Sequence, residues 1–218
     1  MTVREGAQPG VAETHSAYVF FVGDRAYKLK KAVDLGFLDF TTREAREAVC
    51  HREVELNRRL APDVYLGVAD VQGPDGTLCD HLIVMRRMPV DRRLSALLAV
   101  DAPVDDHLRH LARLLAAFHA RAGRSAAADL EAGVDATRRR WQDNTEALLR
   151  IDSLRGVGPG IEVIQGMADR YLDGRAKLFA RRIDDGRAVD GHGDLLADDV
   201  FCLDDGVLVL TVDLRPPS

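Results

Sequence analysis

The sequence predicts an α+β fold in two parts: a small antiparallel sheet with one helix over residues 1–89, and a mainly helical part over residues 90–218. In the first part, short runs rich in β-branched and aromatic residues alternate with turns that contain Gly, Pro and Asp, as in antiparallel strands. Between Pro89 and Ile183 the apolar residues instead recur three and four positions apart, which is the spacing of helices. The 218 residues, 46% of them hydrophobic, are enough to bury a core.

The first part is expected to contain four strands and one helix. The strands are predicted over residues 17–22, 25–31, 64–71 and 81–88. The helix is expected to begin at Thr41 or Thr42, because Thr41 and Glu44 have the spacing of a capping box, and to end before Pro62.

The second part is expected to contain three helices followed by two short strands. The helices are predicted from Asp101 and Pro103 to Gly123, over 136–150 and over 161–183, and the strands over 200–203 and 207–212. The apolar residues of each helix fall on one stripe, and we interpret these stripes as core without a chemical role. The stripes comprise Leu108, Leu111, Leu115 and Phe118; Trp141, Thr145 and Leu148; and Ile164, Met167, Tyr171, Leu178 and Phe179.

Composition excludes several classes of function. The net charge of -5 and the pI near 5.8 argue against a nucleic-acid-binding surface, which needs a basic excess on one face. No apolar run is long enough to span a bilayer, and the N-terminus lacks the apolar segment of a signal peptide. Cys50, Cys79 and Cys202 are odd in number and far apart, so we expect buried thiols rather than disulfides or a zinc cluster. These observations predict a cytoplasmic protein.

The most informative stretch is His192–Asp199, which reads His-Gly-Asp-Leu-Leu-Ala-Asp-Asp. Asp194 and Asp199 have the spacing of a phosphotransferase catalytic loop, in which the first residue accepts the proton of the attacking hydroxyl and the residue five positions on binds magnesium. An aspartate suits the second position because magnesium prefers hard oxygen ligands. The alternative is an acidic surface loop without catalytic function.

Three of the four lysines of the chain, Lys28, Lys30 and Lys31, lie on one predicted strand. Strand alternation places Lys28 and Lys30 on one face and Lys31 on the other. The stripe of the following helix comprises Val49, Glu53, Leu56 and Leu60. Because an isolated carboxylate on an apolar stripe is costly, we expect a Lys28–Glu53 ion pair. The alternatives are a solvated strand edge for the lysines and a Glu53 that reaches solvent at the margin of the stripe.

The order of these elements is that of a bilobal kinase, and six segments make the resemblance specific. They are Glu13–Ser16, Tyr27–Lys31, Gly36–Phe40, Leu56–Pro62, Val84–Pro89 and Gly191–Asp199. With these segments in the family's order, the chain resembles the bacterial aminoglycoside-phosphotransferase-like family of small-molecule kinases, in particular the branch often fused to a second, P-loop kinase domain. The resemblance implies a protein-kinase-like fold, ATP and Mg²⁺ as cofactors, and an aminoglycoside- or sugar-like acceptor. It also implies a companion P-loop kinase domain as a partner.

The resemblance assigns the phosphate-binding residues. Lys28 matches the phosphate-anchoring lysine of the family, with Lys30 as the alternative and Glu53 as the ion-pair partner. The chain has no glycine-rich loop, as is usual in the resembled family, so the segment Thr14-His15-Ser16 could offer N–H and hydroxyl groups to the phosphates. A simple strand-entry turn is the alternative for that segment.

The resemblance assigns the hinge and the catalytic loop in the same way. Main-chain groups of the segment from Met85 to Met88 would meet the adenine, while the two Met side chains pack nearby. His192 matches the histidine that orients the catalytic loop, with Asp194 as the base and Asp199 on the metal. A metal-dependent hydrolase built on His192 is the weaker interpretation, because no second histidine lies at a suitable spacing.

The sequence departs from the family at its C-terminal end. The second metal-binding aspartate of kinases aligns with Thr211, and the nearest carboxylate is Asp213, which can take its place if the strand slips by one pair. The alternative is that Asp213 is an unrelated terminal residue. The family continues through further helices where this chain ends at Ser218, so we expect a member that lacks its C-terminal part. Two functions follow: an ATP- and Mg²⁺-dependent phosphotransferase, or a catalytically inactive kinase-like nucleotide-binding module.

Overall fold

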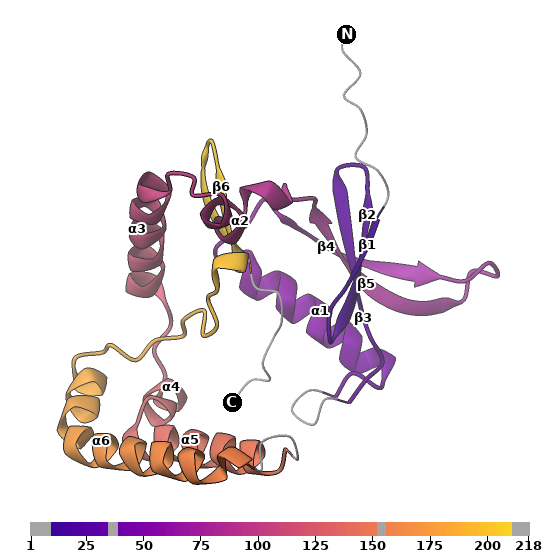
Figure 1. The fold of residues 1–218 in the computed structure, drawn as a ribbon. Coiled ribbons are helices and arrows are strands. Elements are labelled where there is room, and N and C mark those ends of the chain that lie inside the picture. The colour runs from indigo at the N-terminus through magenta and orange to yellow at the C-terminus, as the bar shows by residue number, and fades with distance from the viewer. Residues whose placement is uncertain (1–9, 35–38, 152–155, 211–218) are drawn as a thin grey trace. The chain divides into compact units, whose positions relative to one another are not determined.

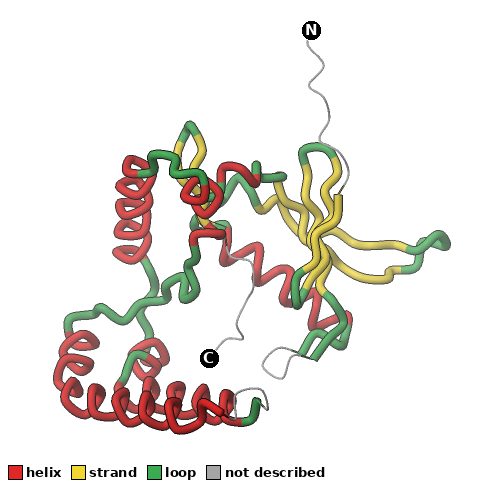
Figure 2. Tube along the Cα trace, in the orientation of Figure 1, coloured by secondary structure: helices red, strands yellow, loops and turns green. Residues whose placement is uncertain are grey.

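The structure, a computed structural model, describes residues 10–34, 39–151 and 156–210. It has a mixed α+β fold with an antiparallel sheet (Figure 1). The chain forms two compact units, the first made of residues 1–118 and 192–218 and the second of residues 119–191. All strands of the described residues lie in the first unit, whereas the second unit shows only helices and loops (Figure 2).

Five strands of the first unit form one antiparallel sheet. They are β1 (Gly10–Glu13), β2 (Ala17–Val22), β3 (Arg25–Lys30), β4 (Tyr65–Gln72) and β5 (Leu78–Arg86). Their order across the sheet is β1-β2-β3-β5-β4, so β3 lies at the centre. The four strands predicted for this part are present, the strand over 17–22 with the predicted ends and the other three with shifted ends. β1 has no counterpart among them, because its sequence Gly-Val-Ala-Glu contains a single residue of high strand propensity.

Helix α1 (Arg43–Asn57) follows β3 in the chain and packs on β4 and β5. Its N-cap is Thr42, whose side chain accepts a hydrogen bond from the N–H of Ala45 at 3.2 Å. The capping box predicted from Thr41 is wrong, because the Thr41 hydroxyl donates to the carboxylate of Asp39 at 2.6 Å instead.

The remainder of the first unit consists of short helical segments, part of a longer helix and a β-hairpin. They are η1 (Val90–Arg92), α2 (Leu94–Ala99), α3 (Asp105–Arg121, whose last three residues belong to the second unit), η3 (Ala197–Asp199), β6 (Val200–Leu203) and β7 (Gly206–Val209). α3 begins later than the predicted Asp101, because Asp101 has a φ of 51° and is not helical.

Two clusters of buried apolar side chains hold the first unit together. The first cluster joins α1, β4 and β5 to the β6–β7 hairpin through Phe201, and the second joins α2 and α3 to the same hairpin through Val200 and Cys202. Successive residues of β6 therefore face different clusters, as strand geometry requires. The hairpin is anchored on both sides, and so is the loop that precedes it.

Besides the last residues of α3, the described part of the second unit contains the following helices. They are α4 (Ala126–Glu131), α5 (Val134–Leu149) and α6 (Gly158–Asp184). α5 and α6 lie side by side (Figure 1) and are joined mainly by polar contacts. Arg138 of α5 contacts Asp169 and Asp173 of α6 at 2.6 and 2.7 Å. The hydroxyl of Thr145 and the side chain of Gln165 add a contact of 2.7 Å.

The prediction that the stripes of α5 and α6 are core is wrong in this structure. The exposed residues of these stripes are Trp141, Leu148, Ile164, Met167, Tyr171 and Leu178. Contacts such as Thr145–Gln165 and Arg138–Asp169 join the two helices, while these stripe residues remain exposed. The fully buried apolar residues described in this unit are Ala136, Leu172 and Ala188.

The cysteines only partly follow the expectation of burial. Cys50 and Cys202 are buried, whereas Cys79 is exposed because it lies on β5 close to the turn that follows β4. No helix among the described residues combines the length and the apolar character needed to cross a membrane.

Candidate functional site

Three charged side chains meet in the interior of the first unit. Nζ of Lys28 lies 2.8 Å from Oε1 of Glu53, and Nζ of Lys30 lies 2.8 Å from Oε2 of the same carboxylate. All three side chains are almost fully buried. We name them the lysine–glutamate cluster. The predicted ion pair between Lys28 and Glu53 is confirmed, and Lys30, expected as an alternative to Lys28, contacts the same carboxylate from its other side.

Strand alternation explains why two lysines converge on one carboxylate. Lys28 and Lys30 are two residues apart on β3, so both face α1, while Lys31 lies on the other side and pairs with Glu13. The predicted faces of the three lysines are therefore confirmed. A solvated strand edge describes neither Lys28 nor Lys30, because both are buried.

Helix α1 presents Glu53 from its buried face. That face comprises Arg46, Cys50, Glu53, Val54 and Asn57, which follow each other at helical spacing. Burial of Glu53 agrees with the prediction, but its expected companions Val49 and Leu56 are only half-buried, because the buried face is rotated toward Cys50 and Asn57. Nδ2 of Asn57 donates to the main-chain oxygen of Glu53 at 2.9 Å and stabilises the turn that carries the carboxylate.

Phe40 and Cys50 border the lysine–glutamate cluster. The ring of Phe40 lies 5.4 Å from Nζ of Lys30, within the range of a cation–π contact. Burial raises the pKa of the Cys50 thiol to about 11, and the negative charge of Glu53 adds to the rise. Cys50 is therefore a protonated, apolar part of the wall and not a nucleophile.

Arg46 ties the N-terminal half of α1 to strand β5. Its Nε lies 3.1 and 3.0 Å from the two carboxylate oxygens of Asp80, and its Nη2 lies 2.9 Å from one of them. Its Nη1 donates to the main-chain oxygens of Phe40 and Thr41 at 2.8 and 3.1 Å. One guanidinium thus connects α1, β5 and the segment whose Phe40 covers Lys30. Its position seven residues before Glu53, on the same helix face, is a sequence signal that could have identified it.

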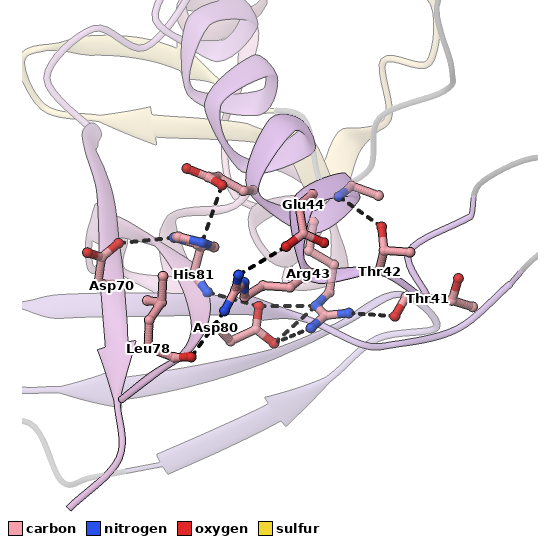
Figure 3. A network of polar contacts seen from close by, with 11 residues as sticks. Thr41, Thr42, Arg43, Glu44, Asp70, Leu78, Asp80 and His81 are labelled. Atoms are coloured by element: carbon pink, nitrogen blue, oxygen red, sulfur yellow. Dashed lines mark hydrogen bonds and ion pairs between the residues drawn. The ribbon is translucent and has the colours of Figure 1, made fainter. Parts of the chain in front are cut away.

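His81 makes a second link between the sheet and α1. Its Nδ1 lies 3.0 Å from a carboxylate oxygen of Asp70 on β4, and its Nε2 lies 3.5 Å from Glu47 on α1 (Figure 3). The side chain is almost fully buried. The helix that carries Glu53 is therefore fixed to the sheet at two points, Arg46 and Glu47, and both precede Glu53 in the chain.

The loop His192–Asp199 ends in η3, which buries Asp199 and leaves Asp194 exposed. Oδ2 of Asp199 accepts a hydrogen bond from the N–H of Leu196 at 3.0 Å, and its main-chain oxygen accepts one from the N–H of Leu210 at 2.9 Å. Loss of water on burial raises the pKa of the Asp199 carboxyl, although the hydrogen bond from Leu196 acts in the opposite direction.

His192 and Gly193 shape the start of this loop. Gly193 has a φ of 84°, a conformation that glycine adopts without steric cost. Nδ1 of His192 accepts a hydrogen bond from the N–H of Asp194 at 3.4 Å, and the ring also bonds the main chain of Leu210. Burial lowers the pKa of His192 more than the charges of Asp199 and Asp194 raise it, so the imidazole is neutral at pH 7.

Tyr65, the first residue of β4, was not singled out in the sequence. It is 1% exposed and packs in the first apolar cluster with Phe201 and Leu210. Burial raises the pKa of its hydroxyl well above the usual value, and the charges of Glu53 and Asp199 add to the rise. Both carboxylates therefore lie close enough to act on one phenol. A lone aromatic residue at a strand start looks like core, so the sequence offers no signal of this position.

The remaining predicted site residues lie at the edges of the sheet. Thr14-His15-Ser16 forms the turn between β1 and β2, in which Oγ1 of Thr14 accepts the N–H of Ala17 at 3.0 Å. In that turn His15 is exposed and Ser16 is buried. Met85 on β5 and Met88 just after it are half-buried and pack against the first apolar cluster.

The candidate metal ligands are only partly described. Asp213 and Thr211 lie outside the described residues. Within the described ranges, no three or more His, Cys, Asp or Glu side chains are grouped closely enough to hold a metal ion together. Asp194, Asp198 and Asp199 are the carboxylates of the loop for which the structure gives a position, and Ser95 donates to the carboxylate of Asp198.

The site thus belongs to a mixed α+β protein with a buried lysine–glutamate cluster beside an acidic loop. No family model matches the chain. It is 44% identical over 194 residues to uncharacterized proteins of Mycobacterium bovis and of two strains of Mycobacterium tuberculosis. The match covers 89% of this chain but 39% of each relative, so the chain spans about two fifths of the length of the curated relatives it matches.

Proposed function

We propose that the chain is an ATP- and Mg²⁺-dependent phosphotransferase with a bilobal, protein-kinase-like fold, similar to the aminoglycoside-phosphotransferase-like kinases. Its acceptor is a hydroxyl of a small polar molecule of aminoglycoside or sugar type. The observation that carries this proposal is the buried ion pair between Lys28 on the third strand and Glu53 on the helix that follows it. In protein kinases, a lysine on the third strand and a glutamate on the next helix form the pair that holds the nucleotide phosphates.

Two further features of the first unit support the proposal. Asp194 and Asp199 have the spacing of a kinase catalytic loop, and Asp199 and Glu53 both act on the hydroxyl of Tyr65. The turn Thr14–Ser16 closes the hairpin of β1 and β2, next to the strand that carries Lys28. A hairpin turn beside the lysine strand is where kinases place the loop that covers the phosphates.

The residues present fit a triphosphate bound with magnesium. The ammonium groups of Lys28 and Lys30 are suited to phosphate oxygens. Oδ1 of Asp199 accepts no hydrogen bond from the described part of the chain, and an oxygen of this kind is a ligand that magnesium prefers. When bound, the nucleotide supplies the phosphoryl group that is transferred, and the metal neutralises part of its charge.

The protein side chains would act mainly by position and charge. Asp194 is exposed on the loop, so its carboxylate is accessible to accept the proton of an acceptor hydroxyl. Neutral His192 holds the loop through the N–H of Asp194 and the main chain of Leu210. Glu53 orients Lys28 from the interior. Catalysis of this kind depends on positioning and charge neutralisation rather than on a covalent intermediate.

A nucleotide-binding module without phosphotransfer is the second candidate function. The observation that favours it is Thr211 at the position where kinases carry their second metal-binding aspartate. Under either function, the extra length of the mycobacterial relatives leaves room for the companion P-loop kinase domain that the resemblance implies.

Thermal unfolding with ATP and Mg²⁺ tests the proposal. A ligand that binds only the folded state raises its stability by mass action, so wild type should melt several degrees higher with ATP and Mg²⁺ than without them. Lys28→Met should lose most of this increase. Lys31→Met is the matched control, because Lys31 directly follows the same strand but pairs with Glu13 instead of Glu53, and it should keep the increase.

Asp194→Asn separates the two candidate functions. The variant should bind nucleotide as wild type does but lose phosphate transfer to a panel of sugars and aminoglycosides. Binding of nucleotide without transfer by wild type would favour the inactive module. If ATP and Mg²⁺ change the melting temperature of neither wild type nor the control variant, both functions are wrong.

A further inference from the structure

The outer side of the α5–α6 pair carries the largest group of exposed apolar side chains in the second unit. We define the apolar face by Trp141 of α5 and by Ile164, Met167 and Tyr171 of α6. These residues, with Leu172 and Phe179, line a groove of about 390 Å³ between the two helices. Each of the four is at least 40% exposed, and exposed apolar residues gathered in this way usually mark a contact surface.

The spacing of the face is that of a helix buried in a core. Ile164, Met167 and Tyr171 follow each other at intervals of three and four, and Leu178 continues the stripe seven residues later. In the first unit, the side of α1 that carries Cys50 and Val54 faces the sheet and is buried. On α6 the residues lie on the opposite side from Asp169 and Asp173, which contact α5. Helix α6 therefore has two sides suited to contact, and within the second unit α5 contacts one of them.

The second unit also buries very little apolar surface by itself. Its fully buried apolar residues among those described are Ala136, Leu172 and Ala188, two of which are alanines. Burial of apolar area is the main term that offsets the loss of conformational entropy on folding. A helical unit with so small a core gains much of its stability from what covers its exposed stripe.

We propose that the apolar face is an interface with a segment of a longer protein, namely the part that the mycobacterial relatives carry outside the matched region. More than half of each relative lies outside the match, although the matched part is 44% identical to this chain. The segment would present aliphatic and aromatic side chains to Trp141, Ile164 and Met167. A segment of the same polypeptide is present at high effective concentration and loses little entropy on docking, whereas a second copy has to associate.

Cysteine accessibility tests the proposal. Ile164→Cys and Met167→Cys are introduced one at a time into this chain, with Cys79→Ser to remove the exposed native thiol. The same positions are changed in the full-length Mycobacterium tuberculosis relative, and maleimide labelling rates are measured in both proteins. Lys177→Cys is the matched control, because Lys177 is an exposed residue of α6 that does not line the groove. Light scattering gives the oligomeric state of each protein.

In this chain both face positions should label about as fast as the control. In the longer protein they should label at least about tenfold more slowly while the control is unchanged, because labelling then requires local opening. Equal rates in the longer protein would overturn the proposal. Slow labelling of a monomer of this chain would mean that the face is already covered within it, and slow labelling of a dimer would identify a second copy as the occupant. Either result also overturns the proposal.

Discussion

At the residue scale, the chain places a carboxylate with no exposed side-chain surface between two ammonium groups. Burial of a single charge is very costly, and an ion pair compensates for it only when its geometry is good. Glu53 meets this condition at Oε1, which accepts a hydrogen bond from Lys28 at 2.8 Å, and Nζ of Lys30 lies 2.8 Å from Oε2 as a contact between opposite charges. Removal of the central charge would leave the ammonium groups of Lys28 and Lys30 buried next to each other.

Glu53→Gln should therefore destabilise the protein by about 3 kcal/mol or more, the usual cost of breaking a buried ion pair from one side. The free energy of unfolding in urea measures the effect. Glu55→Gln is the control on the same helix, because Glu55 is exposed and pairs only with Arg52 at the surface. A control variant as unstable as Glu53→Gln would show that the loss arises from the helix rather than from the cluster.

Asp199, in the loop His192–Asp199, is another carboxylate whose negative charge is disfavoured by its surroundings. Burial raises the pKa of Asp199, so the folded state holds the proton more tightly than the unfolded chain does. By linkage, the folded state gains from this carboxyl at pH values below the unfolded pKa, and the gain is lost as the pH rises through the folded pKa. Ionised Asp199 is thus a cost to the ligand-free protein near neutral pH.

Asp199→Asn should remove this pH dependence while keeping an oxygen that accepts the Leu196 N–H. The difference in melting temperature between variant and wild type should grow in favour of the variant as the pH rises from about 4 to 7, because only wild type must ionise the buried group. Thermal unfolding across this range measures it. A constant difference at all pH values would contradict the raised pKa.

At the scale of elements, the site depends on how α1 is fixed to the sheet. Arg46 bonds Asp80 of β5 and the main chain of Phe40 and Thr41, and His81 adds a second link through Glu47. Both links lie in the first half of α1, and Glu53 lies in its second half, where Asn57 bonds its main chain. Because α1 is fixed to β5, the position of β5 determines where Glu53 lies relative to Lys28.

Arg46→Met should reduce the free energy of unfolding by about 2–4 kcal/mol, since it removes several charge-assisted hydrogen bonds and leaves Asp80 with a partly buried charge. Arg43→Met is the comparison, because Arg43 has a more exposed side chain and bonds Glu44 and the main chain of Leu78. Urea unfolding measures the free energy of unfolding of both variants. Similar losses in the two variants would show that the Asp80 contact has no special weight.

At the scale of the whole molecule, the two units differ in how much core they contain. Both clusters of buried apolar side chains belong to the first unit, which also holds the lysine–glutamate cluster and the acidic loop. The second unit holds its helices together mainly by contacts such as Arg138 with Asp169 and Asp173. Stability is therefore distributed unevenly along the chain.

Hydrogen exchange should show this difference directly. In the 218-residue chain the amides of α5 and α6 should exchange at least about tenfold faster than those of α1 and β5, because opening the second unit exposes little buried apolar surface. Exchange followed by mass spectrometry resolves the helices separately. Equal protection of α6 and α1 would contradict the view that the second unit has an incomplete core.

Much of the first unit could be predicted from sequence because its signals are local. The alternation of Lys28 and Lys30 on β3 requires only strand geometry, and burial of Glu53 requires only helical spacing. Where two local signals competed, the sequence was insufficient: Thr41 and Thr42 both suit an N-cap, and Asp39 decides between them by binding Thr41. The approach of Tyr65 to both carboxylates joins segments far apart in the chain, which no local pattern encodes.

The sequence by itself indicated most strands and the longer helices and which side chains share a face, because propensity and periodicity act over a few residues, but it did not indicate β1, α2 or α4. Only the tertiary structure decided which faces are buried. Both α1 and α6 carry an apolar stripe, yet α1 packs on a sheet while Ile164, Met167 and Tyr171 of α6 remain more than half exposed. Burial depends on a second surface from elsewhere in the chain, and a periodic pattern records only that a helix has an apolar side.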